Sequence, residues 1–239
     1  MNDLSSLLPE FPRTPHLPIE ANAASDDKVC SIDDLRWLLS QTRVVVEEKL
    51  DGANSGITIH NDQPVIRNRS KILSKNYNAK GKAKVQFVAI WTWFYDNKNK
   101  IQKLADILGF MPSIYGEWLY AKHTTHYDSL PDLFVAYDIY NPSTKEFLDP
   151  LVSRALLTDV GFSVPPLRFK GQVDIDTLLA LRNMKSEFST SQACEGVYIK
   201  VGDANKMTAR FKMVAQTFSP SETWVKEELA KNTVKKTRL

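Results

Sequence analysis

Hydrophobic and polar positions change their period along the chain, and these changes mark the predicted elements. Alternating or β-branched segments predict strands, and apolar residues spaced three or four apart over Val85–Leu108 predict one or two helices. The tight turn Asn61-Asp62 should join two of the strands as a hairpin. The predicted strands are Arg43–Lys49, Ser55–His60, Pro64–Asn68, Ser113–Tyr120, Leu133–Tyr140, Glu195–Val201 and Met207–Val214.

Capping residues predict further helices. Ser31 is a typical N-cap, and the two aspartates that follow suit the first turn of a helix ending near Ser40. A second helix should begin with Pro150 in its first turn and end before Gly161. A third is expected to extend to about Lys185. The predicted N-caps are Ser31, Asp149, Asp174 and Ser221.

Strands and helices do not alternate strictly, and neighbouring strands are mostly close enough in sequence to form hairpins. This arrangement favours an α+β fold over a doubly wound sheet. The proline-rich segment Leu4–Asp27 should be extended and irregular, because proline fixes φ and lacks an N–H group. We expect an N-terminal segment, 1–30, packed on a main domain, 31–214, and then a short helix with a basic tail, 215–239.

The composition is that of a globular protein. Hydrophobic residues make up 43% of the 239 residues and charged residues 25%, which excludes wholesale disorder. No apolar run is long enough for a membrane span, and the N-terminus lacks the apolar core of a secretory signal. Cys30 and Cys194 are far apart, which excludes a disulfide scaffold. An intracellular location, cytoplasmic by default and without membrane contact, is expected.

Positive charge is concentrated in one segment. The net charge is only +3, but residues 63–95 include no acidic side chain. The cationic side chains of this segment would either neutralise the phosphates of a nucleic acid or belong to a solvated loop, and both interpretations stay open. Helical spacing places Phe87, Trp91 and Phe94 in the core. The cations are Arg67, Arg69, Lys71, Lys75, Lys80, Lys82 and Lys84; a second basic cluster, Lys231, Lys235, Lys236 and Arg238, fits a frayed tail.

The most informative short motif is Lys49-Leu50-Asp51-Gly52, directly after a hydrophobic strand. A lysine amine is a nucleophile only when it is unprotonated, so its surroundings must lower its pKa or hold a cation beside it. Asp51 could orient the amine or hold a hydrated metal ion, and Gly52 would let the backbone approach a ligand closely. The alternative is a surface strand that ends in an ordinary lysine and turn.

Five more motifs follow this one in order along the chain. Together they resemble the motifs of the covalent nucleotidyltransferases, the superfamily of polynucleotide ligases and capping enzymes. Asn54 resembles the phage nick-sealing RNA ligases, and segments 11–17 and 122–128 resemble small stand-alone RNA-ligase-domain proteins. The motifs are Arg67–Ser70, Tyr115–Trp118, Phe134–Tyr140, Glu195–Lys200 and Ala209–Lys212.

The resemblance implies an antiparallel-sheet adenylation domain with flanking helices and no C-terminal OB-fold. It would be an ATP-dependent ligase, most simply of RNA, joining 5′-phosphate and 3′-hydroxyl ends through lysyl-AMP on Lys49. Asp51 and Lys212 would also be catalytic. Mg²⁺, with Mn²⁺ as its substitute, would be held by Asp51, Glu117 and Glu195. The implied ATP-binding residues are Glu48, Lys49, Asn54, Arg69, Glu117, Tyr137, Glu195, Arg210 and Lys212, with Phe134 competing with Tyr137 to stack on the base.

Two departures from the family pattern bear on the function. Arg210 stands where a lysine is usual, and arginine keeps its charge but does not release a proton. After Lys212 too few residues remain for an OB-fold, so a partner protein or the N-terminal segment is expected to complete the site. RNA or other nucleic-acid ends are the expected partners. A DNA ligase, a capping-type guanylyltransferase and an inactive nucleic-acid-binding module remain as alternatives.

The histidines predict little. His123 and His126 stand three apart, but two histidines without a third ligand indicate zinc only weakly. The sequence assigns no role to them or to His16.

Overall fold

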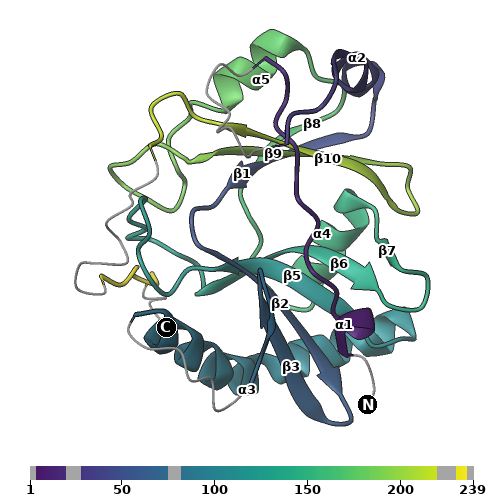
Figure 1. Cartoon of the computed structure of the whole chain (residues 1–239), viewed down its shortest axis with the longest axis vertical. Coiled ribbons are helices and arrows are strands. Elements are labelled where there is room, and N and C mark those ends of the chain that lie inside the picture. The colour runs from purple at the N-terminus through teal and green to yellow at the C-terminus, as the bar shows by residue number, and fades with distance from the viewer. Residues whose placement is uncertain (1–3, 20–27, 75–81, 220–229, 236–239) are drawn as a thin grey trace.

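The computed structural model describes residues 4–19, 28–74, 82–219 and 230–235 (Figure 1). Part of the lysine-rich segment, the helix predicted after Ser221 and the end of the basic tail lie outside these residues. Within them the chain forms two antiparallel sheets with five helices, so the predicted α+β class is confirmed.

The smaller sheet has four strands in the order β10-β9-β1-β8, and the larger has six in the order β4-β3-β2-β5-β6-β7. All pairings between neighbours are antiparallel. The strands are β1 (Val44–Lys49), β2 (Ala53–His60), β3 (Gln63–Asn68), β4 (Ile72–Leu73), β5 (Ser113–Trp118), β6 (Phe134–Asn141), β7 (Glu146–Phe147), β8 (Leu167–Lys170), β9 (Gly196–Gly202) and β10 (Met207–Val214).

The helices begin where capping residues predict. Ser31 and Asp34 form a reciprocal capping box at one helix, and the Asp149 carboxylate accepts hydrogen bonds from two backbone N–H groups at another. The apolar pattern after the lysine-rich segment forms one continuous helix. The helices are α1 (Leu4–Leu7), α2 (Ile32–Ser40), α3 (Lys82–Leu108), α4 (Pro150–Asp159) and α5 (Ile175–Leu181).

The hairpin of β2 and β3 turns where the sequence indicates. Asn61 and Asp62 have φ values of 49° and 58°, the left-handed conformation that a two-residue hairpin turn requires and that Asn and Asp tolerate. The pairing then runs from His60 opposite Gln63 to Ser55 opposite Asn68. This register places Asn54 at the start of β2 and Arg69 just after β3.

Several short elements differ from the predictions. The structure adds α1 inside the segment expected to be extended, and also the strands β4, β7 and β8. The two-residue strands β4 and β7 are too short to show alternation, and β8 alternates over only four residues, the minimum for the pattern. Helix α5 ends at Leu181 instead of near Lys185, because Lys185 instead forms an isolated bridge with Ala193.

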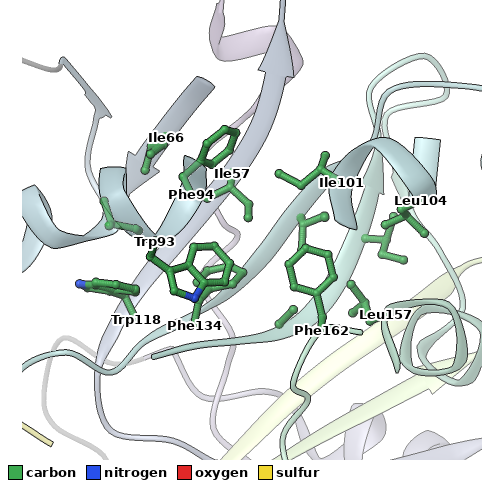
Figure 2. Packing of buried hydrophobic residues seen from close by; sticks show 14 of the residues in the cluster. Ile57, Ile66, Trp93, Phe94, Ile101, Leu104, Trp118, Phe134, Leu157 and Phe162 are labelled. Carbon is green, nitrogen blue, oxygen red and sulfur yellow. The ribbon is translucent and has the colours of Figure 1, made fainter. Parts of the chain in front are cut away.

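The main core lies between the six-stranded sheet and the helices α3 and α4 (Figures 1 and 2). Trp93 of α3 packs against Phe134 of β6 with ring centroids 4.9 Å apart. Phe87 and Phe94 are buried here and Trp91 packs against the cluster, as their helical spacing predicts. A second core joins the four-stranded sheet to α2 and α5.

The N-terminal segment runs from one sheet to the other (Figure 1). Leu8 and Phe11 pack against tyrosines of the six-stranded sheet, whereas Leu17 lies in the core of the four-stranded sheet. Backbone bonds tie it to β10, since the Lys212 N–H donates to the Pro15 carbonyl. Among the described residues, no helix combines the length and hydrophobicity that a membrane span needs.

Candidate active site

A cavity of about 390 Å³ is lined by residues from both sheets and from α3. The ends of β1 and β2 meet here, because the chain passes from one sheet to the other through Leu50–Gly52. The lining residues are Lys49, Leu50, Asp51, Gly52, Ala53, Asn54, Asn68, Arg69, Ser70, Gln86, Phe87, Glu117, His123, Glu195 and Tyr198.

Lys49 is the last residue of β1, and its amine forms an ion pair with Glu195. Its Nζ also lies 5.6 Å from the centre of the Tyr198 ring. Burial lowers the pKa of Lys49, but the paired Glu195 carboxylate, with smaller contributions from Tyr198 and Glu117, outweighs it and leaves the pKa above its usual value. The amine is therefore protonated in the free protein.

Two carboxyl groups beside Lys49 bind protons unusually well. Burial raises the pKa of Glu117 to about 8, although Lys49 partly offsets this effect. Burial likewise raises the pKa of Glu195 to about 7, again against the attraction of Lys49. Glu195 Oε2 is buried and has no hydrogen-bond partner among the described residues. The cavity thus holds carboxyl groups that a cation would readily ionise.

Asp51 joins the turn after β1 to the loop at 122–128. Its Oδ2 accepts hydrogen bonds from the N–H groups of Thr124 and Thr125, both at 2.7 Å. Its own N–H donates to the Tyr127 hydroxyl, also at 2.7 Å. One carboxylate oxygen is therefore committed to this loop, and Oδ1 is the atom left for a ligand.

The glycine that follows is required by packing against the sheet. A Cβ atom at Gly52 would lie 2.8 Å from the carbonyl oxygen of Trp118 and 2.6 Å from the Leu119 side chain. The sequence suggested a close approach of the backbone to a ligand. In the structure the backbone at Gly52 closely approaches the end of β5, and Gly52 also lines the cavity, so the approach to a ligand stays a prediction.

Asn54 and Glu117 stand opposite each other on β2 and β5 and both line the cavity. The Asn54 Nδ2 donates to the Tyr137 hydroxyl at 2.5 Å, while its Oδ1 is buried without a partner among the described residues. Arg69, just after β3, lines the same cavity with an exposed side chain.

The family is settled by comparison with known proteins. Residues 42–214 match the RNA ligase family. The chain belongs to the RNA ligase family. This match confirms the resemblance carried by the Lys49 motif and the motifs that follow it.

Solved structures with the same fold include Naegleria gruberi RNA ligase. A mutant of that protein with ATP and Mn has a TM-score of 0.58 and 17% identity over 77% of this chain. The same ligase with PPi has a TM-score of 0.54 and 18% identity over 76%. The chain spans only 52% of the length of these proteins. Among curated proteins, none matches the chain.

Six of the residues predicted for this RNA ligase family member line the cavity together: Lys49, Asp51, Asn54, Arg69, Glu117 and Glu195. Glu48, Tyr137, Arg210 and Lys212 are not among the lining residues. Their roles in binding ATP stay predictions, and the contacts of each show what holds it elsewhere.

Glu48 points away from the cavity. Its carboxylate pairs with Arg168 at 2.6 Å and accepts hydrogen bonds from the Ser186 hydroxyl and the Glu187 N–H. Neighbouring side chains on a strand point to opposite faces, so Glu48 and Lys49 diverge. Glu48 anchors the segment before β9.

Tyr137 lies beside the cavity, under the N-terminal segment. Its ring is 5.5 Å from that of Phe11 and 6.3 Å from that of Tyr198, the second at an angle of 36°. Phe134, the competing residue for the base, is fully buried against Trp93 in the main core. Of the two aromatics, Tyr137 is the one near the site.

Arg210 is held outside the cavity by two aromatic rings. Its guanidinium carbon lies 4.5 Å from the ring centre of Phe11 and 4.2 Å from that of Phe147. Lys212, two residues on, stands opposite Tyr198, and its charge weakly offsets the burial of Glu195. Lys212 is therefore closer to the chemistry than Arg210.

A buried charge cluster, missed in the sequence, lies behind the cavity. Lys200 of β9 pairs with Glu47 of β1 at 2.7 Å and with Asp138 of β6 at 2.9 Å. Arg154 of α4 also pairs with Glu47, at 3.0 Å. Glu47 and Lys200 belong to one sheet and Asp138 to the other, so this cluster ties the two sheets together.

The lining residues to which the sequence assigned no role include Tyr198, His123 and Gln86. Val197 and Ile199 lie in the core, so alternation along β9 would have predicted that Tyr198 faces the other way. Burial lowers the pKa of His123. Gln86 follows no recognisable motif.

No group of three or more His, Cys, Asp or Glu side chains that could hold a metal ion occurs among the described residues. The pair His123 and His126 therefore gives no support for zinc.

Proposed function

We propose that the chain is an ATP-dependent RNA ligase that works through lysyl-AMP on Lys49. The supporting observation is that Lys49 lines the cavity beside acidic residues and pairs with one of them, Glu195. Membership of the RNA ligase family supports the choice of reaction.

In the first step, Lys49 Nζ would attack the α-phosphorus of ATP. A P–N bond forms, the α–β phosphoanhydride bond breaks, and pyrophosphate leaves. In the free protein the proton of Lys49 is held against Glu195 Oε1, and it would leave to solvent when a cation engages Glu195. The AMP then passes to a 5′-phosphate, and a 3′-hydroxyl displaces it to seal the strand.

The cavity fits a divalent metal ion held through few protein ligands. Glu195 Oε2 is buried without a partner among the described residues, and Glu117 and Asp51 line the same space. Mg²⁺ commonly keeps several waters and uses one or two carboxylates with substrate phosphates, so a preformed three-ligand group is not required. When bound, Mg²⁺ would neutralise phosphate charge.

The base of ATP would lie between Tyr137 and Tyr198. Their ring centres are 6.3 Å apart and the rings are tilted by 36°, the geometry of an aromatic pair in contact, so one ring must move before a base can enter. A small rotation of Tyr198, which is only half-buried, would admit the base. Asn54 would then contact the nucleotide through its free Oδ1.

Phosphate contacts are proposed for Arg69 and Lys212. Arg69 reaches the cavity with an exposed guanidinium, and Lys212 lies on the strand beside Tyr198. Cations at these places suit the charge that shifts to oxygen during phosphoryl transfer. We also propose that the N-terminal segment, with Phe11 on Tyr137, completes the nucleotide side of the site.

The decisive experiment is intact mass spectrometry of the full chain after incubation with ATP and Mg²⁺. One adenylate should be added to the protein and to the control Lys103→Ala, an exposed lysine on α3, but not to Lys49→Ala. Labelling by GTP instead of ATP would favour a capping enzyme. No adduct with either nucleotide would favour an inactive nucleic-acid-binding module.

The substrate is tested separately with the adenylated protein. Sealing of nicked RNA, DNA and hybrid duplexes should be fastest with RNA ends. Faster sealing of DNA would contradict the RNA assignment while leaving the adenylation chemistry intact.

A further inference from the structure

Gln86 is a buried polar residue of the cavity that the mechanism above does not use. It lies in α3, its side chain is only 2% exposed, and it lines the cavity beside Phe87. Its backbone carbonyl accepts a hydrogen bond from the Trp118 indole N–H at 2.8 Å, which fixes the helix against β5.

The side-chain oxygen of Gln86 has no hydrogen-bond partner among the residues that the structure describes. A buried acceptor left unpaired is destabilising, so folded proteins rarely keep one without a function. Water in the cavity can pair with this oxygen in the free protein, and a ligand that displaces the water must supply a donor in its place.

The ligand group must carry an O–H or N–H. Phosphate oxygens at neutral pH are acceptors only, so they cannot pair with the Gln86 oxygen. The proposed stacking on Tyr137 places the base amine elsewhere, because Tyr137 packs in a cluster with Tyr115 and Tyr140 on one face of the six-stranded sheet, whereas α3 packs against the opposite face (Figure 1). Ribose hydroxyls are the remaining donors.

We propose that Gln86 is a specificity-determining residue whose side-chain oxygen accepts a hydrogen bond from a ribose hydroxyl. This inference rests on the proposed function and extends it to sugar selection. The hydroxyl belongs to ATP or to the terminal nucleotide of the RNA. Arg69 and Ser70, which line the same cavity, would hold the adjoining phosphate.

The test compares the full chain with Gln86→Leu, which keeps much of the side-chain volume but removes the acceptor. Gln102→Leu is the matched control, because Gln102 is exposed on the same helix. One arm measures adenylation by ATP, 2′-deoxyATP and 3′-deoxyATP. The other measures sealing of nicks whose 3′-hydroxyl nucleotide is ribo or 2′-deoxy, with protein already adenylated.

We expect one ribo-to-deoxy ratio to fall by about tenfold in Gln86→Leu, the usual worth of one hydrogen bond to a hydroxyl, and to stay unchanged in the control. A fall in the first arm assigns the hydroxyl to ATP, and a fall in the second assigns it to the RNA end. Ratios equal to those of the wild type in both arms would overturn the proposal.

Equilibrium binding of the same ribo and deoxy compounds separates this proposal from the proposed function. If the wild type forms no adduct, the ligase assignment fails, but the binding ratios still decide the role of Gln86. The melting temperature should not fall in Gln86→Leu, since no buried partner is left behind. A large fall would show that Gln86 is structural, and would contradict the proposal.

Discussion

At the scale of single residues, Lys49 meets two opposed demands. Its ion pair with Glu195 keeps the amine charged, which suits a buried lysine in a cavity that must attract ATP. The attack on phosphorus needs the neutral amine. The pairing resolves the conflict only if the charge of Glu195 is engaged elsewhere once ATP is bound, which is what a divalent metal at Glu195 would do.

Glu195→Ala tests this account of the carboxylate. The variant should need at least tenfold more Mg²⁺ for half-maximal adenylation and should transfer AMP more slowly, because one metal ligand is lost. Titration of the adenylation rate with Mg²⁺ measures both effects. Glu146→Ala, at an exposed carboxylate, is the control. An unchanged Mg²⁺ requirement would contradict the metal role.

Glu117 should make the stability of the free protein depend on pH. Its pKa is raised from 4.5 to about 8 by burial, so between these values the folded state holds a proton that the unfolded state releases. The stabilisation from this proton is therefore full below pH 4.5 and is lost as the pH rises toward 8. A pKa difference of one between the two states corresponds to about 1.4 kcal/mol, so the loss should exceed about 2 kcal/mol.

Urea denaturation at pH 5, 6, 7 and 8 measures this effect. In Glu117→Gln the fall in the free energy of unfolding should be much smaller, because the amide does not titrate. Glu146→Gln should behave like the wild type, since Glu146 is partly exposed and paired on the surface. Equal slopes for wild type and Glu117→Gln would show that Glu117 does not titrate in this range.

At the scale of elements, sequence patterns predict the caps and turns that are stabilised by residues close together in the chain. The capping box at Ser31 and the turn at Asn61-Asp62 are specified within a few residues, and both form as expected. The strand β8 is different. Its four residues, Leu167–Lys170, alternate between apolar and polar side chains, but so short a run is weak evidence alone, and the strand is held by its pairing with β1, far away in sequence.

The N-terminal segment is another element whose position depends on distant partners. Phe11 packs with its ring centre 5.2 Å from that of Tyr115 and 5.9 Å from that of Phe147, and it also covers Arg210. Proline spacing predicted an extended chain but not these contacts. The segment therefore has two roles: it stabilises the fold, and through Phe11 it packs against the ring of Tyr137.

Phe11→Ala should lower the free energy of unfolding by about 3 kcal/mol, as for other buried aromatic residues. It should also weaken ATP binding, because Tyr137 loses one of its ring neighbours. Denaturation and ATP titration measure the two effects, and Val29→Ala, at an exposed position, is the control. Unchanged ATP affinity in a destabilised variant would limit Phe11 to a structural role.

At the scale of the whole molecule, the site exists because two sheets meet. Lys49 and Glu195 come from the four-stranded sheet or its edge, and Asn54 and Glu117 from the six-stranded one. The order of the motifs predicted that these residues lie together, but the sequence did not predict two sheets. It also did not predict that Arg210 packs on aromatic rings or that Glu48 pairs with Arg168. Such outcomes depend on competition among partners far apart in the chain.

The buried ion pairs of Lys200 connect the two sheets. Both of its acidic partners, Glu47 and Asp138, are nearly inaccessible to water, so removing the lysine would leave two buried charges without their main cation. Breaking a buried ion pair from one side commonly costs about 3–5 kcal/mol, because the remaining charge stays desolvated. Lys206 offers a comparison, since it stands just before β10 and pairs with Glu146 of β7 on the surface.

Lys200→Met should therefore lower the free energy of unfolding by about 3–5 kcal/mol, whereas Lys206→Met should lower it by less than about 1 kcal/mol. Both substitutions remove a lysine that links the two sheets, so burial is the main difference between them. Adenylation at temperatures where Lys200→Met is still folded should also be slower, because the cavity depends on the spacing of the sheets. Similar losses of stability in the two variants would show that the buried cluster does not hold the sheets together.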